Sequence, residues 1–244
     1  MLKRCFSIFV DFTDNKRYQM EFHFATVLKD ATPMLLKGLK VTVSISVISL
    51  LIGMLIGLIS CLFGLSKIPV LRWISNIYIW IIRGTPMIVQ AFIVYYGIPM
   101  IVQQFSPDFI ISEYLAGVIT LSLNAGAYLS EIFRSGIQAV DIGQTEASRS
   151  LGVSAAKTMM YIVLPQAFKI TIPSIVNQFI ITVKDTSILS VISLAEICNQ
   201  AKQYVGTSYI YFETYILVGL GYLFIISILM IISKLVEKKF SYDK

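Results

Sequence analysis

Two adjacent charges lie in the middle of an otherwise apolar stretch of this chain. Lys184 and Asp185 interrupt the uncharged run between Lys169 and Glu196. Each ion at the centre of a membrane helix costs about 2.5–3.5 kcal/mol, so such a pair is expected only where it faces protein or water. Neighbouring residues point about 100° apart on a helix, which argues against a simple pair between them. The position therefore predicts either a ligand contact or ion pairs with other helices.

Further polar side chains lie within or beside apolar runs. Asn124 is followed by small residues, which leave room for a ligand or a close helix, and Gln90 lies well inside another apolar run. Contact with a ligand and hydrogen bonding between helices explain these two side chains equally well. Arg83, Glu131 and Arg134 lie at the ends of apolar runs. We expect these three to anchor helices at the membrane interface or to form gate salt bridges.

The residue types that bind metals or perform acid-base catalysis are scarce. His23 is the single histidine, and the cysteines Cys5, Cys61 and Cys198 are scattered. This pattern predicts free thiols, and it predicts neither a metal site nor a disulfide framework. The chain contains no HExxH or GxSxG motif, so a membrane-embedded enzyme is disfavoured. The net charge of +6 is better explained by basic cytoplasmic loops than by nucleic-acid binding.

The composition shows which elements must position these side chains. Hydrophobic residues make up 56% of the 244-residue chain and charged residues 14%, with a mean hydropathy of +0.76. Soluble domains carry about 25% charged residues, so we expect an all-α polytopic membrane protein. A membrane helix needs about 20 mainly apolar residues. The uncharged runs predict five transmembrane helices, at about residues 41–65, 84–105, 114–131, 170–195 and 214–234.

The segment between the first two spans has the pattern of an interfacial helix. Arg72, Asn76 and Arg83 fall near one helical face, and the aromatic residues of the segment suit a membrane interface. Thr85 is then the expected N-cap of the next helix, with Pro86 as its first residue. An interfacial helix and the inner end of a kinked second span fit this segment equally well.

The distribution of basic residues predicts how the spans are oriented. Lys and Arg are nearly absent from alternate loops and are concentrated in segments 67–72, 131–169 and 234–244. Because cytoplasmic loops carry the excess of Lys and Arg, these segments and the C-terminus are expected inside. Five spans then place the N-terminus outside. The basic tail of residues 1–33, expected to be interfacial, contradicts this rule by its charge.

The longest cytoplasmic segment, residues 138–168, predicts two short helices. Thr145 is the expected N-cap of a helix that begins at Glu146, where an acidic side chain is favoured in the first turn. Gly152 is expected to end that helix in the left-handed conformation, and Ser154 is the expected N-cap of the second helix. Two helices joined at a glycine bend would make a rigid knob on the cytoplasmic face.

This segment also carries a pattern similar to the EAA loop of ABC-importer permeases. Ser148 replaces the second alanine of that pattern, and the matching residues are Glu146, Ala147, Gly152, Leu164 and Pro165. Three further segments resemble the polar amino-acid uptake permeases: RGTPMIVQAF (83–92), LNAGAYLSEIFRSGI (123–137) and VKDTSILSVISLAEI (183–197). Their order and spacing match as well, and the resemblance covers residues 34–240. The chain is identified as a member of this permease family by resemblance.

The resemblance implies the five-helix type I ABC importer (MetI-like) permease fold in a bacterial-type plasma membrane. It implies a transport subunit that is not itself an enzyme. The chain lacks the GxxxxGK[ST] motif, so ATP and Mg²⁺ are expected on a partner ABC ATPase. The other implied partners are an extracytoplasmic amino-acid-binding protein and a second permease, in a homodimer or a heterodimer. The residues of the EAA-like pattern would couple the permease domain, residues 34–240, to the ATPase.

The resemblance also implies that the intramembrane charges, Lys184 and Asp185, lie near a bound amino acid. At 1.5 Å per residue, Lys184 lies roughly 22 Å beyond Lys169, in the outer half of a core about 30 Å thick. An amino-acid zwitterion needs an anion for its ammonium group, which Asp185 would supply. It also needs donors for its carboxylate, and a helix break at Thr186-Ser187 would expose backbone amides for it. The amino acid stays open, as does the alternative of a self-sufficient secondary transporter or channel.

Overall fold

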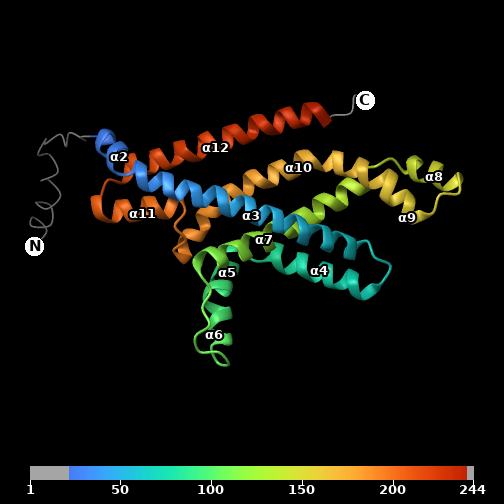
Figure 1. The fold of residues 1–244 in the computed structure, drawn as a ribbon, viewed down its shortest axis with the longest axis horizontal. Coiled ribbons are helices and arrows are strands. Elements are labelled where there is room, and N and C mark those ends of the chain that lie inside the picture. Colours follow the sequence, from blue (N-terminus) through green and yellow to red (C-terminus); the bar gives the residue numbers. More distant parts are fainter. Residues whose placement is uncertain (1–21, 241–244) are drawn as a thin grey trace, which may run out of the picture.

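A computed structural model describes residues 22–240, and within that range the chain forms helices and turns but no strand. Figure 1 shows the long helices, namely α3 (Thr32–Gly64), α4 (Pro69–Gly84), α7 (Glu113–Gln138), α10 (Leu164–Asp185) and α12 (Tyr211–Phe240). Four helical stretches in this range are long and apolar enough to cross a membrane, or five if a bent pair that includes α4 forms one span. The predicted all-α membrane fold is confirmed.

Helices α3 and α7 form the centre of the bundle. Small residues line their contact, which lets the two backbones approach closely. A Cβ atom at Gly57 would lie 2.8 Å from the Cβ atom of Leu129 and 2.9 Å from the carbonyl oxygen of Gly126. Gly57 therefore serves a close contact between helices of the same chain. Helix α10 packs against α7 as well, where Thr171 lies opposite Gly136.

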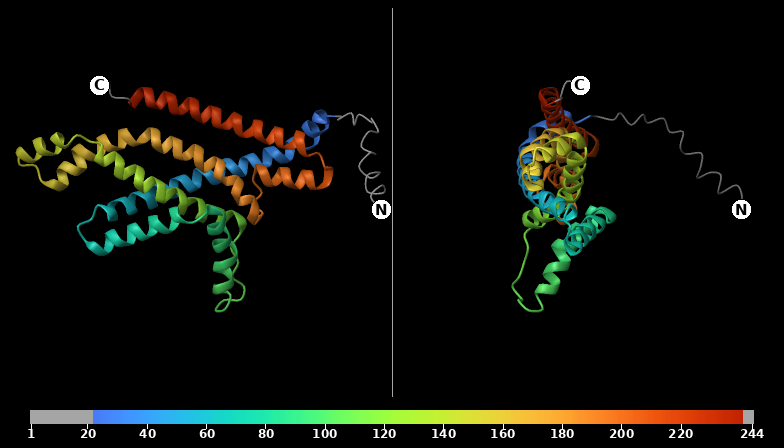
Figure 2. Two further views of the ribbon diagram at one scale, coloured as in Figure 1. Left: turned by 180° about the vertical axis from the view of Figure 1, so that it is seen from behind. Right: turned by 90° about the vertical axis from the view of Figure 1, so that its right-hand side faces the viewer.

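A sharp bend follows α4. The helices Pro69–Gly84 and Met87–Val102 meet at 105°. The second of them comprises α5 (Met87–Phe92), the π-helix η2 (Ile93–Gly97) and α6 (Ile98–Val102). Figure 2 shows that this segment projects from the bundle and that the chain then returns to α7. The helix Met87–Val102 thus occupies the range of the span predicted at about 84–105, and the bend separates it from α4.

The residues at this bend differ from the predicted cap. Thr85 ends α4 with an extended backbone, and its hydroxyl donates a hydrogen bond to the carbonyl oxygen of Ile81 at 2.8 Å. Pro86 takes the N-cap position of α5, so the prediction of Thr85 as N-cap and Pro86 as first helical residue is wrong. Proline disfavours a helical conformation in the residue before it, and it has no N–H to donate to Ile82. The α-helix ends for these two reasons.

Both π-helices of the described chain precede a proline. In η2, the N–H of Ile98 donates to the carbonyl oxygen of Ile93, and Pro99 follows. In η3 (Met159–Val163), the N–H of Leu164 donates to the carbonyl oxygen of Met159, and Pro165 follows. A proline inside a helix crowds the carbonyl group four residues earlier. A widened turn relieves this crowding, so the helix continues through each proline.

Helical hydrogen bonding changes after Asp185, where the sequence predicts a break. The α-helix α10 ends at Asp185, and a 3-10 helix, η4 (Thr186–Ile192), follows. The chain then turns at Ser193, which has a left-handed backbone with φ 64°. The segment beyond, interpreted from the sequence as a loop, contains the helix α11 (Ile197–Ser208).

A buried carboxylate holds the start of α11. Glu196 is fully buried and accepts hydrogen bonds from the N–H groups of Cys198 and Asn199 at 2.9 and 2.6 Å. The Tyr222 hydroxyl of α12 donates to the same side chain at 3.1 Å. Burial raises the pKa of Glu196, and these hydrogen bonds partly oppose that shift. The helix α2 (Phe24–Asp30) completes this end of the molecule, whereas residues 1–21 of the predicted interfacial tail lie outside the described residues.

Candidate functional site

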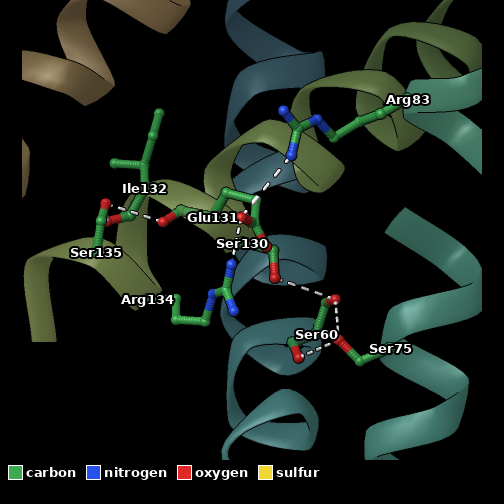
Figure 3. A network of polar contacts seen from close by, with 8 residues as sticks. All are labelled: Ser60, Ser75, Arg83, Ser130, Glu131, Ile132, Arg134 and Ser135. Atoms are coloured by element: carbon green, nitrogen blue, oxygen red, sulfur yellow. Dashed lines mark hydrogen bonds and ion pairs between the residues drawn. The ribbon is translucent and has the colours of Figure 1, made fainter. Parts of the chain in front are cut away.

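Three charged residues predicted as anchors or gate residues meet between α4 and α7. Arg134 Nη2 lies 2.6 Å from Glu131 Oε2, and Arg83 Nη1 lies 3.8 Å from the same oxygen (Figure 3). The guanidinium group of Arg83 also lies over the ring of Tyr128, 5.2 Å from its centroid. Arg83 comes from the last turn of α4, and the other residues come from α7. Two cations thus share one carboxylate.

The residues of α7 in this cluster share one helical face with Asn124. Asn124, Tyr128 and Glu131 are spaced four and three residues apart, which places them on one stripe of the helix. We call this stripe the polar face of α7. Asn124 is 9% exposed, whereas the side chains of Glu131 and Arg83 are 30% and 42% exposed. Charged side chains within membrane helices face protein or water rather than lipid. The polar face of α7 is therefore suited to line a path or a subunit contact.

A cluster of serine hydroxyl groups lies beside the charges. Ser60 Oγ lies 2.9 Å from Ser75 Oγ, and Ser130 donates to Ser60 at 3.1 Å (Figure 3). Ser75 also donates to the carbonyl oxygen of Ser60 at 2.8 Å. These buried bonds join α3, α4 and α7. Sequence reasoning missed them, although small polar residues within apolar runs are the signal that indicates such contacts.

Gln90, a predicted substrate contact, lies at the bend after α4. Its Nε2 donates to the carbonyl oxygens of Ile82 and Thr85 at 2.8 and 3.1 Å, and to the Thr85 hydroxyl at 2.9 Å. Ile82 is the residue whose carbonyl group loses its helical donor because Pro86 has no N–H. The donors of Gln90 are thus used by the bend. Its Oε1 is buried and has no hydrogen-bond partner within residues 22–240.

The other predicted substrate contacts lie at the junction of α10 and η4. Lys184 is exposed and Asp185 is half-buried. The Thr186 hydroxyl, fully buried, donates to the carbonyl oxygen of Val183 at 2.8 Å, and the Ser187 hydroxyl donates to that of Lys184 at 2.7 Å. Within residues 22–240, no ion pair joins Lys184 to Asp185, and no hydrogen bond or ion pair joins either side chain to the polar face of α7. The side chains of Lys184 and Asp185 are therefore not bonded to the polar face of α7.

The segment predicted to be cytoplasmic folds into a helical hairpin that begins earlier than predicted. Asp141 is the N-cap of α8 (Ile142–Ser150), and its Oδ1 accepts a hydrogen bond from the N–H of Gly143 at 2.7 Å. The prediction of Thr145 as N-cap is therefore wrong, because Asp141 offers a capping carboxylate one turn earlier. Glu146 and Ala147 consequently lie within the helix rather than in its first turn, and both are exposed.

The bend of the hairpin has the predicted geometry. Gly152 has φ +80°, in the left-handed region that favours glycine. The N–H of Gly152 donates to the carbonyl oxygen of Arg149 at 3.0 Å, and that of Val153 donates to that of Ser148 at 3.3 Å. Ser154 is the N-cap of α9 (Ala155–Thr158) and accepts from the N–H of Lys157 at 3.4 Å. The predictions for the conformation of Gly152 and for the Ser154 cap are confirmed.

Side chains close the hairpin across this bend. The hydroxyl groups of Ser148 and Thr158 are buried and lie 2.9 Å apart, and Arg149 Nη1 donates to the carbonyl oxygen of Val153 at 2.7 Å. Leu151 at the tip is 84% exposed. Two side-chain hydrogen bonds thus close the hairpin, and its apolar tip is exposed. We call residues 141–158 the inner hairpin.

The remaining coupling candidates lie where the chain continues from the hairpin into α10, with Leu164 half-buried and Pro165 exposed. Leu164 and Pro165 are at the start of α10, which continues from α9 through η3. Both line an apolar cavity of about 470 Å³, together with Met54 of α3 and Phe133 of α7. They are therefore placed to connect the hairpin with the spans rather than to lie on the hairpin surface. Within residues 22–240, no group of His, Cys, Asp and Glu side chains is arranged to hold a metal ion.

Comparison with known proteins agrees with this architecture. The chain is similar to the arginine transport system permease protein ArtQ of Bacillus subtilis (strain 168), with 41% identity over 207 residues that cover 85% of this chain and 92% of ArtQ. It is also similar to the L-cystine transport system permease protein TcyB of the same organism, with 40% identity over 171 residues that cover 70% of each chain.

Solved structures show the same fold. A crystal structure of an amino acid ABC transporter with histidines has a TM-score of 0.84 and 37% identity, covering 90% of this chain and 100% of that chain. The methionine ABC transporter MetNI in an inward-facing conformation has a TM-score of 0.69 at 15% identity, a likeness of fold alone that covers 86% of this chain and 97% of that chain. Residues 49–242 match the family described as "Binding-protein-dependent transport system inner membrane component". The chain belongs to this family.

Proposed function

We propose that this chain is the permease subunit of an ATP-driven ABC importer that carries a polar amino acid delivered by an extracytoplasmic binding protein. The observation that carries the proposal is the 41% identity with an arginine permease over 85% of the chain. The inner hairpin with its exposed tip is the feature expected of a subunit driven by a separate ATPase. ATP and Mg²⁺ would bind to that ATPase, and a second permease would complete the pore.

The inner hairpin supplies the coupling surface in this proposal. Glu146 and Leu151 are exposed on α8 and at its end, where a partner groove can receive them. Because Ser148 and Thr158 join the two helices, a displacement of the tip moves the hairpin as one body. The motion then reaches Leu164 and Pro165 at the start of α10. The N-terminus lies outside and the C-terminus inside, in accordance with the basic inner segments.

The substrate path follows the polar face of α7 in this proposal. Asn124, Tyr128 and Glu131 form a continuous stripe, with Arg83 beside it. Asp185 would meet the ammonium group of the substrate nearer the outer side. Two permeases would enclose the path between their polar faces, which keeps the charges away from lipid.

The test is ATP-dependent uptake into proteoliposomes that contain both permeases and the ATPase, with the binding protein added. Competition by each of the twenty amino acids identifies the substrate. We expect uptake to require ATP hydrolysis and to persist when ion gradients are collapsed. Uptake that survives loss of ATP and follows an ion gradient would reject the proposal and support a secondary transporter. A complex with a hydrolysis-deficient ATPase is the matched control.

A further inference from the structure

Arg83 differs from Arg134, the other cation of the polar cluster, in having unused donors. Its guanidinium group donates no hydrogen bond within residues 22–240, and its contact with Glu131 is an ion pair at 3.8 Å. Arg134, by contrast, lies 2.6 Å from Glu131 and donates a hydrogen bond to it. A guanidinium carries five N–H donors in a fixed planar fork. Arg83 therefore retains nearly all of its capacity to bind an anion.

The contact with Tyr128 positions the guanidinium group of Arg83. The Tyr128 ring lies 5.2 Å from the guanidinium carbon, in a cation–π contact. Such a contact uses the face of the guanidinium plane and leaves the N–H groups at its edge available. Those N–H groups match the two oxygens of a carboxylate in a bidentate arrangement. The Tyr128 ring thus positions the guanidinium group of Arg83 and leaves its N–H groups free to bind an anion.

The charges around Arg83 also favour an anion. Glu131 is the one carboxylate that forms an ion pair within residues 22–240, and Arg134 already occupies it. Two cations against one anion leave the cluster with an excess positive charge. This excess of positive charge attracts an anionic ligand. The side chain of Arg83 is 42% exposed, so a ligand can reach it.

From this geometry, and resting on the proposed transport of an amino acid, we infer that Arg83 binds the α-carboxylate of the substrate on the polar face of α7. The Tyr128 ring positions the guanidinium group, and Arg134 neutralises Glu131 so that it does not repel the carboxylate. The site recognises the group that all amino acids share, so it selects amino acids over amines rather than one side chain over another.

The test measures binding without the binding protein, whose own selectivity would hide the effect. The permease–ATPase complex in nanodiscs is titrated with three amino acids and their decarboxylated analogues: L-arginine and agmatine, L-cystine and cystamine, L-glutamine and 4-aminobutanamide. We expect at least one amino acid to bind at least about tenfold more tightly than its analogue, as a charge-assisted pair supplies. In Arg83→Gln this ratio falls to about one. Arg83→Lys keeps the charge but loses the fork, so an intermediate ratio is expected.

Two further variants separate recognition from folding. Tyr128→Leu removes the ring and should lower the ratio while Arg83 remains. Arg72→Gln removes an exposed arginine of the same helix and should leave the ratio unchanged. The inference is overturned if the preference for carboxylate persists in Arg83→Gln, or if the wild-type complex shows none. If no amino acid binds although ATP-dependent uptake is normal, the inference fails and the proposed function stands. If uptake itself is missing for all twenty amino acids, the proposed function fails.

Discussion

The inner hairpin and the interior of the bundle satisfy their polar groups in different ways. Within the hairpin, the side-chain bonds join near neighbours, and the widest, between Ser148 and Thr158, spans 10 positions. In the bundle, bonds join distant segments, as between Ser60 and Ser130, 70 positions apart. The bundle also holds polar groups without partners in the described chain, such as Gln90 Oε1. In the proposed function, the hairpin transmits motion and therefore needs internal bonds that keep its shape. The interior of the bundle forms the path of a polar solute and therefore needs polar groups that are free to bind it.

The largest expected effect comes from the bend of the hairpin. Gly152→Val forces a β-branched residue into the left-handed conformation at φ +80°, which costs roughly 1–2 kcal/mol or more. Because the tip then changes shape, we expect uptake to fall at least about tenfold while the ATPase still hydrolyses ATP. Uptake and ATP hydrolysis measured together in proteoliposomes check this uncoupling.

The matched control for this variant is Gly219→Val. A Cβ atom at Gly219 would meet open space, and this glycine lies within the helix α12. We expect normal uptake and normal coupling from it. Full uptake by Gly152→Val would show that the bend is not needed for coupling. The proposed role of the hairpin in transmitting motion would then be rejected.

The second prediction concerns the bend between α4 and α5. Gln90→Leu removes the donor to the carbonyl oxygens of Ile82 and Thr85, which leaves them without that partner. Loss of hydrogen bonds to these part-buried acceptors costs about 1 kcal/mol, so thermal unfolding in detergent should occur at a lower temperature. Gln203→Leu, at an exposed position of α11, is the control. Unchanged stability combined with weaker amino-acid binding would instead assign Gln90 to the substrate, as the sequence suggests.

Local sequence predicts the hairpin well because its structure depends on neighbouring residues. Gly152 and Ser154 have conformations that follow from their own chemistry and from one turn of helix on either side. The start of α8 was harder to predict, since both Asp141 and Thr145 are good capping residues. The choice between them depends on where the preceding helix ends, which the capping pattern does not contain.

The interior is less predictable because its contacts join segments far apart in the chain. At Thr186-Ser187, where the sequence predicts a helix break, the α-helix changes to a 3-10 helix and the chain stays helical to Ile192. The 105° angle after α4 does not follow from Pro86 alone. Helix α11 lies in a segment of mixed composition, and it is held by Glu196 and Tyr222, 26 positions apart. The meeting of Arg83 with Tyr128 required the packing of α4 on α7. Residue types therefore indicated candidates, and tertiary contacts separated free groups from occupied ones.

The third prediction concerns the hydrogen bond that closes the hairpin, between Ser148 and Thr158. Ser148→Ala leaves the buried Thr158 hydroxyl without its partner, whereas Ser148→Ala combined with Thr158→Val removes both polar groups. The single variant should lose about 1 kcal/mol of stability, and the double variant should lose less than the sum of the two singles. A double-mutant cycle from thermal unfolding gives this coupling energy. Additive losses would mean that the two hydroxyl groups do not stabilise the hairpin together.

The smallest expected effect is a pH dependence at the start of α11. The pKa of Glu196 is raised by burial, so folding favours its protonated form. Its contribution to stability is complete below the unfolded pKa, about 4.3, and is lost as pH rises through the folded pKa.

Glu196→Gln keeps an oxygen acceptor for the N–H groups of Cys198 and Asn199 but does not titrate. The stability of the wild-type protein should therefore fall relative to this variant as pH rises. Thermal unfolding of both proteins between pH 4 and pH 8 measures the difference, with exposed Glu237→Gln as the control. A difference that does not change with pH would mean that the hydrogen bonds to Glu196 fully offset its burial.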